Sequence, residues 1–202
     1  SKSGVTPYEL SNIVPAKSDT TFSAAYDSKR GKYFLAYQNT AIKTGTQLRG
    51  LVLGETTDRK LVDSEYNMEP VITYNQATDS YVLFYIETAI STRVVKAAKF
   101  SADTSLNSPI PTAALFSKPV STFLGNMNLL SHQSKAEVSI LYEDGEDITI
   151  KGYTVQAKKP AELGSAQISF PEKQRLSEQS VASDPETGNL VLAYSDRGDG
   201  QD

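Results

Sequence analysis

Two acidic loops carry the side chains of this sequence whose types and spacing could do chemistry. One runs from Glu143 to Asp147 and the other from Asp196 to Asp202. Clustered carboxylates on a loop that contains glycine can supply the oxygen ligands that Ca²⁺ prefers. Neither loop has the spacing of an EF-hand, so a solvated turn is the alternative interpretation of each. The candidate calcium ligands are Asp144, Asp147, Asp196 and Asp199, and the wider set of binding candidates adds Glu146 and Arg197.

The second acidic loop also contains the tripeptide Arg197-Gly198-Asp199, which resembles integrin-adhesion sequences. Turns rich in Gly and Asp are common in any β-protein, so a three-residue match also arises by chance. An adhesion role requires the tripeptide to lie at the tip of an exposed loop.

Catalytic chemistry has few candidates in this chain. The sequence contains one histidine, His132, and no cysteine, so it lacks the usual general base and any thiolate nucleophile or metal ligand. A glycoside-cleaving enzyme would need two carboxylates roughly 5–10 Å apart, and Asp144 or Asp147 could provide one and Asp196 the other. We assign no catalytic residue, and the sequence favours a non-catalytic protein over this alternative.

The composition predicts a folded protein and argues against nucleic acid as a partner and against a transmembrane helix. The 202 residues are 39% hydrophobic and 22% charged, which is typical of a globular domain with a core. The net charge of −4, without a basic stripe, argues against nucleic acid as a partner. No apolar run is long enough for a transmembrane helix. Without cysteine or an N-glycosylation sequon, a disulfide-built ectodomain is disfavoured, and we expect an exported or cell-surface location in preference to a cytoplasmic one.

The elements that must position these loops are four similar hairpins. Each contains a strand rich in β-branched and aromatic residues, a short polar turn and a second such strand that ends on tyrosine. The hairpins span Ser23–Tyr37, Glu69–Tyr85, Leu130–Tyr142 and Val181–Tyr194. The two acidic loops directly follow the third and fourth hairpins, at equivalent positions.

Two further strands are expected after each of the first three hairpins. They lie at Leu48–Gly54 and Lys60–Ser64, at Thr92–Phe100 and within Ala113–Leu124, and at Ile148–Val155 and Ala166–Phe170. The closing tyrosines Tyr37, Tyr85, Tyr142 and Tyr194 are 48, 57 and 52 residues apart. Four strands per unit of about 40–50 residues is typical of a β-propeller blade. Evenly spaced strands also suit a β-sandwich, but the similarity of the units favours the propeller.

The hairpin from Pro70 to Tyr85 resembles the degenerate β-propeller repeat in which an apolar-Ala-Tyr-Asp/Asn strand turns into a Tyr-Leu-Val-Val-Trp strand. Asp27, Asn75 and Asp184 match the position that starts the turn, and the third hairpin departs from the pattern with His132 there. Tyrosine replaces the usual tryptophan in all four units. The resemblance covers most of the chain and implies blades, without identifying a specific family or an activity.

The sequence therefore predicts an all-β protein, a β-propeller or a segment of one, with four blade-like repeats of about 50 residues. We expect one domain over residues 1–202, with repeats at about 21–69, 70–125, 126–177 and 178–202 and with 1–20 as a candidate closing strand. A segment of a longer propeller is favoured over a four-bladed ring with an incomplete blade. The expected function is a non-catalytic binding or structural module that engages protein or glycan through its loops or an open blade edge. An unpaired edge would template another chain's strand and make the protein part of a larger assembly.

Overall fold

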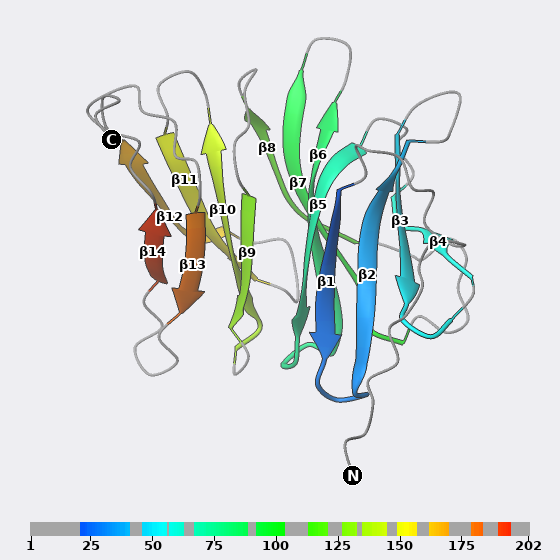
Figure 1. The fold of residues 1–202 in the computed structure, drawn as a ribbon. Coiled ribbons are helices and arrows are strands. Elements are labelled where there is room, and N and C mark those ends of the chain that lie inside the picture. The colour runs from blue at the N-terminus through cyan, green and yellow to red at the C-terminus, as the bar shows by residue number, and fades with distance from the viewer. Residues whose placement is uncertain are drawn as a thin grey trace, which may run out of the picture.

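The structure is a computed structural model, and it is built from β-strands throughout the part that it describes (Figure 1). The described residues are 21–40, 46–55, 57–62, 67–88, 92–103, 113–120, 127–132, 135–144, 149–156, 162–169, 179–183 and 190–194. Within these ranges the chain has no helix that is long and apolar enough to cross a membrane. The prediction of an all-β fold is confirmed.

The strands form three four-stranded antiparallel sheets and one two-stranded pair. The first sheet contains β1 (Phe22–Asp27), β2 (Lys32–Asn39), β3 (Gln47–Val52) and β4 (Arg59–Lys60), and the second contains β5 (Asn67–Asn75), β6 (Ser80–Thr88), β7 (Arg93–Ser101) and β8 (Ala113–Val120). The third contains β9 (Met127–His132), β10 (Glu137–Asp144), β11 (Thr149–Gln156) and β12 (Glu162–Ser169), and the fourth pairs β13 (Gln179–Ser183) with β14 (Leu190–Tyr194). In every sheet each strand pairs with the next one along the chain.

The four hairpins expected from the sequence are confirmed as β1–β2, β5–β6, β9–β10 and β13–β14. The weakly patterned segment within Ala113–Leu124 contains β8, an eight-residue strand. The predicted strand at Lys60–Ser64 was wrong in extent, because β4 consists of Arg59 and Lys60 only. The predicted strand at Ala166–Phe170 begins earlier, since β12 starts at Glu162. The candidate closing strand at 1–20 lies outside the described residues.

The sheets pack face to face in chain order, with their first strands side by side. Contacts link β1 to β5, β5 to β9 and β9 to β13. Among the described strands, no contact of similar extent links β13 back to β1. Each sheet therefore has a face toward the preceding sheet, which we call its leading face, and a face toward the following sheet, which we call its trailing face.

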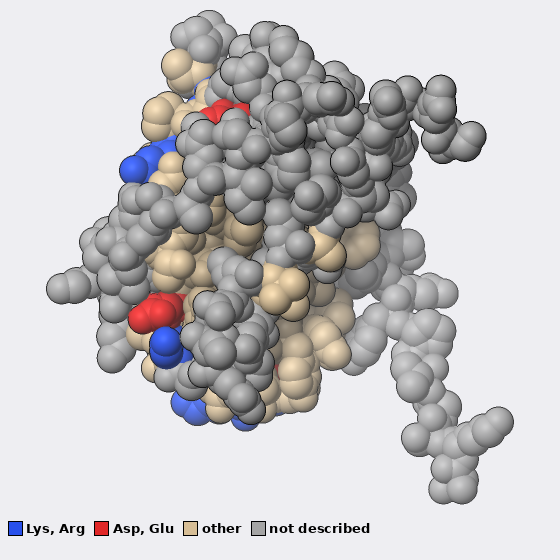
Figure 2. Space-filling view, turned by 90° about the vertical axis from the view of Figure 1, so that its left-hand side faces the viewer, with Lys and Arg blue, Asp and Glu red and all other residues tan. Residues whose placement is uncertain are grey.

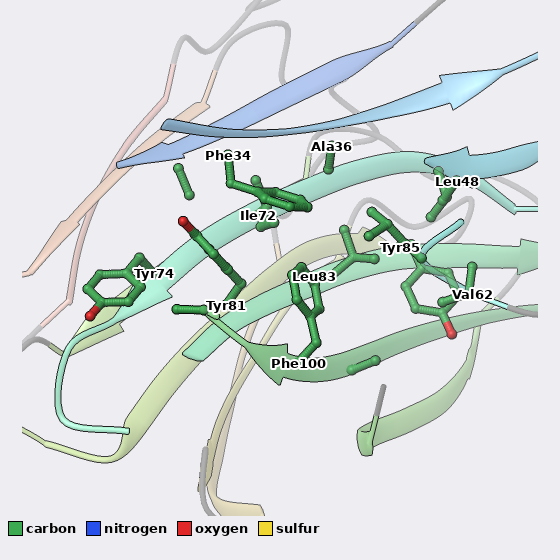
Figure 3. Close-up of a cluster of buried hydrophobic side chains, with 14 of the residues drawn as sticks. Phe34, Ala36, Leu48, Val62, Ile72, Tyr74, Tyr81, Leu83, Tyr85 and Phe100 are labelled. Atoms are coloured by element: carbon green, nitrogen blue, oxygen red, sulfur yellow. The ribbon is translucent and has the colours of Figure 1, made fainter. Parts of the chain in front are cut away.

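The largest apolar core lies between the first and second sheets (Figure 3). The trailing face of the first sheet contributes Ala25, Phe34, Ala36, Leu48 and Val52, and the leading face of the second contributes Ile72, Tyr74, Tyr81, Leu83, Tyr85, Ala98 and Phe100. The Phe34 ring packs 4.8 Å from that of Tyr81 and 5.3 Å from that of Phe100, measured between centroids. Gly50 permits this packing, because a Cβ there would lie 2.5 Å from Phe34 Cζ.

A second core lies between the second and third sheets. Val82, Phe84, Val95, Ala97, Leu115 and Phe116 meet Val138, Ile140 and Tyr142 there. Phe84 and Tyr142 pack with their ring centroids 6.0 Å apart. The two cores use the same strand positions, so the repeated sequence pattern records which residues fill the space between neighbouring sheets.

Candidate binding surface

The strand ends beside the turns of the first three hairpins lie at one end of the sheets (Figure 1) and share one pairing register. The pairs Asp27–Lys32, Asn75–Ser80 and His132–Glu137 close the strands on either side of each turn. The position that starts the turn is therefore the last residue of the first strand in every case, as the sequence pattern predicted. The side chains at this position, Asp27, Asn75 and His132, differ in the hydrogen bonds that they can donate and accept. Each one therefore makes different contacts.

Asp27 starts the first turn and acts only as an acceptor. The side chain is fully buried. Its Oδ1 accepts from the backbone amides of Lys29 at 2.9 Å and Arg30 at 3.0 Å, and its Oδ2 accepts from Arg30 Nη1 at 2.8 Å. Asp27 thereby satisfies the backbone donors of its own turn, a common role for aspartate at this position.

Asn75 starts the second turn and joins it to the third hairpin. Its Oδ1 accepts from the backbone amide of Thr78 at 3.0 Å, as Asp27 does in the first turn. Its Nδ2 donates to Ser131 Oγ at 2.9 Å and lies within hydrogen-bond distance of the carbonyl oxygens of Lys135, at 3.0 Å, and Glu137, at 3.2 Å. An amide supplies both donors and acceptors, so Asn75 connects two sheets where a carboxylate could not.

Asp79 joins the first two turns through its carboxylate. Arg30 donates to both oxygens of Asp79, at 2.7 Å and 2.9 Å, and Lys29 Nζ donates to Oδ2 at 2.8 Å. The Tyr74 hydroxyl donates to Oδ1 at 2.9 Å. Asp79 has φ of +49°, in the left-handed region, at the turn position that Gly31 occupies with φ of +64° in the first hairpin. The bidentate pair with Arg30 is the strong form of this interaction.

These contacts shift the pKa values of the groups involved. Hydrogen bonds from Arg30 and Lys29 hold the pKa of the Asp79 carboxyl well below its usual range. Burial, together with the hydrogen bond to Asp79, raises the pKa of the Tyr74 hydroxyl to about 12. The link between the first two hairpins is therefore a charge pair that forms only when Asp79 is ionised.

We expect the stability of the protein to fall as the pH drops below about 4, where an unfolded Asp begins to bind protons. Asp79 has a lower pKa folded than unfolded, so its contribution is fully present above the unfolded pKa and is lost as pH falls toward the folded one. The variant Asp79→Asn should lose less stability over this range, because its amide does not titrate in it. Asn tolerates the left-handed backbone, which makes it the matched replacement.

Urea unfolding of both proteins at neutral pH and near pH 3 measures this difference. Equal loss of stability in the wild type and in Asp79→Asn would show that the carboxylate does not stabilise the folded state.

The leading face of the first sheet exposes aromatic side chains. Phe22 is 69% exposed, and Tyr26 and Tyr33 are each 50% exposed. Tyr26 and Tyr33 are cross-strand neighbours whose ring centroids lie 4.9 Å apart. Ala24, also exposed, lies between Phe22 and Tyr26 on β1. We call these four residues the aromatic face.

The opposite end of the same face is buried and charged. Arg49 donates to both carboxylate oxygens of Asp58, from Nε at 2.5 Å and from Nη2 at 2.9 Å. The Tyr37 hydroxyl donates to the same carboxylate. Burial, with this hydrogen bond, raises the pKa of the Tyr37 hydroxyl, which therefore stays protonated. The exposed part of the leading face is thus confined to its aromatic end.

The second sheet carries the same residue types at the same positions, and there the counterparts of the exposed Tyr26 and Tyr33 are buried. Tyr26, Tyr33, Leu35 and Tyr37 match Tyr74, Tyr81, Leu83 and Tyr85, each 48 residues later and in the same pairing register. Tyr74 and Tyr81 are each 2% exposed because the first sheet covers them. The aromatic face therefore has the chemistry of a sheet-docking surface, but no described sheet covers it.

No protein-family model matches this chain, and no curated protein matches it. The candidate surface thus rests on the geometry of the chain itself.

The structure describes only one of the six binding candidates that the sequence suggested. Asp144 is the last residue of β10 and is buried, with 8% of its surface exposed. Glu146 and Asp147, and likewise Asp196, Arg197 and Asp199, lie outside the described residues. Within the described ranges no three His, Asp or Glu side chains gather as a metal site would require. Calcium binding and the glycoside-cleaving carboxylate pair remain predictions.

His132 ends β9, where the turn of the third hairpin starts, and is partly buried. Its Nε2 lies 2.9 Å from Ser139 Oγ, which in turn lies 3.1 Å from Thr154 Oγ1. Ser139 is 1% exposed, so no substrate can reach its hydroxyl. These hydrogen bonds connect β9, β10 and β11 and have a structural role.

Sequence reasoning missed the aromatic face, although its signal was present. Tyrosines at repeated strand positions are expected to fill the core between blades, and this expectation is correct for Tyr74 and Tyr81. The same role fails for Tyr26 and Tyr33, which are half exposed because no described sheet covers them. The signal in the sequence is the tyrosine pair itself, which recurs at the same positions of the first two hairpins.

Proposed function

We propose that this chain is a non-catalytic interaction module of the β-propeller type that engages another protein through the aromatic face of its first sheet. The propeller assignment is supported by four hairpins in chain order, by sequential pairing within each sheet and by first strands that pack side by side. Propellers arrange four-stranded sheets radially in this way. The fold alone does not define a function, so the proposal depends on the surface.

One observation carries the proposal: Tyr26 and Tyr33 are half exposed, whereas their counterparts Tyr74 and Tyr81 are buried in a sheet interface. Exposed aromatic residues that form a contiguous patch mark interaction sites. A protein partner is favoured over a glycan because the equivalent residues already pack against a protein sheet. The contact then lies on a sheet face, whereas the sequence suggested loops or an open edge.

Titration with the apolar dye bis-ANS, at protein concentrations low enough for a monomer, tests whether this face is an accessible apolar surface. We expect the wild type to bind the dye and the double variant Tyr26→Ser/Tyr33→Ser to lose most of the emission. The variant Lys32→Ser, at an exposed charged neighbour, should bind like the wild type. Equal dye binding by the wild type and the double variant would contradict the proposal.

A glycan array provides the second arm of this experiment. The proposal predicts no oligosaccharide binding that depends on Tyr26 or Tyr33. Binding that the double variant abolishes would replace the protein partner with a glycan.

A further inference from the structure

The last described sheet has an exposed face of its own. Val191 on β14 is 59% exposed, and Ala182 and Ala193 on the same face are also exposed. Ala182 pairs with Val191 across the two strands, so the three residues form one patch. Figure 2 views the molecule from the side on which β13 and β14 lie in Figure 1, and the described residues visible there include basic and acidic ones among others.

Register identifies this patch as a trailing face. Ala182, Val191 and Ala193 hold the positions of Ala25, Phe34 and Ala36 in the first sheet, each 157 residues earlier. Ser180 likewise holds the position of Ser23. The first-sheet residues form the trailing face on which the second sheet packs, and Ser23 Oγ accepts there from the backbone amide of Ile72 at 3.1 Å. The backbone counterpart of Ile72 on the aromatic face is Ala24.

The two exposed faces are therefore the two halves of one interface. The leading face of the first sheet matches that of the second at four of five positions: Tyr26, Tyr33, Leu35 and Tyr37, with Ala24 in place of Ile72. Of these five positions in the first sheet, Ala24, Tyr26 and Tyr33 are exposed. The fourth sheet matches the trailing face of the first at three of four positions: Ser180, Ala182 and Ala193, with Val191 in place of Phe34. Pairing these faces would reproduce the part of the interface between the first two sheets in which Ala25 and Phe34 meet Tyr74 and Tyr81.

We infer that the occupant of the aromatic face is the trailing face of the fourth sheet of a second copy of this chain. Ala24, Tyr26 and Tyr33 are exposed on one face, and Ala182, Val191 and Ala193 are exposed on the other. No extensive contact joins β13 to β1 among the described strands, so one copy does not bring these patches together. Contact between different faces of two copies is heterologous and closes into a ring when the rotation permits. Two copies would place eight sheets in one ring, within the range of propellers. This inference rests on the proposed function and names its partner.

Sedimentation equilibrium of the purified chain, from low micromolar to near-millimolar concentration, tests the inference. We expect the average mass to rise toward twice the chain mass. The variants Tyr26→Arg and Val191→Arg should each weaken association by about 30-fold or more, the effect typical of a residue central to an interface. Both positions are exposed in the single chain, so neither variant should unfold it.

Mixing the two variants distinguishes a heterologous contact from other modes. The Tyr26→Arg protein keeps an intact trailing face and the Val191→Arg protein keeps an intact aromatic face, so the mixture should recover one interface and form a heterodimer. A face-to-face dimer through Tyr26 would not respond to Val191→Arg. A chain that stays monomeric, or associates equally well with both substitutions, would overturn the inference. Dye binding at the aromatic face without self-association would overturn only the second copy as partner and leave the proposed function intact.

Discussion

Replacing Phe34 by Ala is expected to lower the free energy of unfolding by about 3–5 kcal/mol, the range for removing a buried aromatic ring. The Phe34 side chain is fully buried between the first two sheets. Its ring contacts those of Tyr81 and Phe100, so its loss opens a cavity that residues from both sheets line. Urea unfolding followed by tyrosine fluorescence measures the change.

The adjacent residue provides the control for this prediction. Tyr33 precedes Phe34 on β2 and points to the opposite face, where it is half exposed. We expect Tyr33→Ala to change the stability by less than about 1 kcal/mol at a concentration where the chain is monomeric. Equal destabilisation by the two substitutions would contradict the assignment of a buried trailing face and an open leading face.

The second large effect is expected from Asn75→Asp, which should destabilise the protein by about 2–4 kcal/mol at neutral pH. The change removes the amide that donates to Ser131 Oγ. It also places a carboxylate against the carbonyl oxygens of Lys135 and Glu137. A buried charge that faces acceptors is unfavourable, so the side chain should take up a proton more readily than usual and part of the loss should be recovered at acidic pH.

The reciprocal change in the first hairpin is the matched control. Asp27 accepts hydrogen bonds from the amides of Lys29 and Arg30, and the carbonyl oxygen of Asn can accept them too. Arg30 would lose its bond to Oδ2 but keep its bidentate pair with Asp79. Asp27→Asn should therefore destabilise the protein less than Asn75→Asp does. Chemical denaturation of the two variants compares them directly. A smaller effect for Asn75→Asp would show that the amide does not link the second and third hairpins.

Most of the fold could be predicted from the sequence because the pattern has a period of two within strands and recurs along the chain. The four hairpins, their closing tyrosines and the acidic or amide turn position all follow from local residue types. The extent of β4 could not, because Leu61 and Val62 are apolar residues typical of a strand but pack into the core beyond the end of β4. Tertiary packing overrides strand propensity there.

The candidate surface could not be predicted in the same way, because exposure depends on what lies next to a sheet. Tyr26 and Tyr74 occupy the same position in their hairpins, yet one is half exposed and the other is buried. The pairing of Arg30 with Asp79 was equally hidden, because 49 residues separate them. The sequence predicts only that Asp79 lies in a turn, and it does not reveal that Arg30 of the neighbouring turn pairs with it. The local pattern identifies the kind of contact that a residue can make. The arrangement of the sheets decides whether the residue is buried in an interface or exposed.

Chemical cross-linking between positions 24 and 180 tests the central claim most directly. The chain contains no cysteine, so the variants Ala24→Cys and Ser180→Cys each introduce a single thiol. In the interface between the first two sheets, the equivalent positions are joined by the hydrogen bond from the Ile72 amide to Ser23 Oγ. We predict that a short bismaleimide links the two single-cysteine proteins to each other when they are mixed, whereas Ala25→Cys, on the buried trailing face, does not link to Ser180→Cys. A link within one chain that carries both Ala24→Cys and Ser180→Cys, or no link between the mixed single-cysteine proteins, would contradict the account.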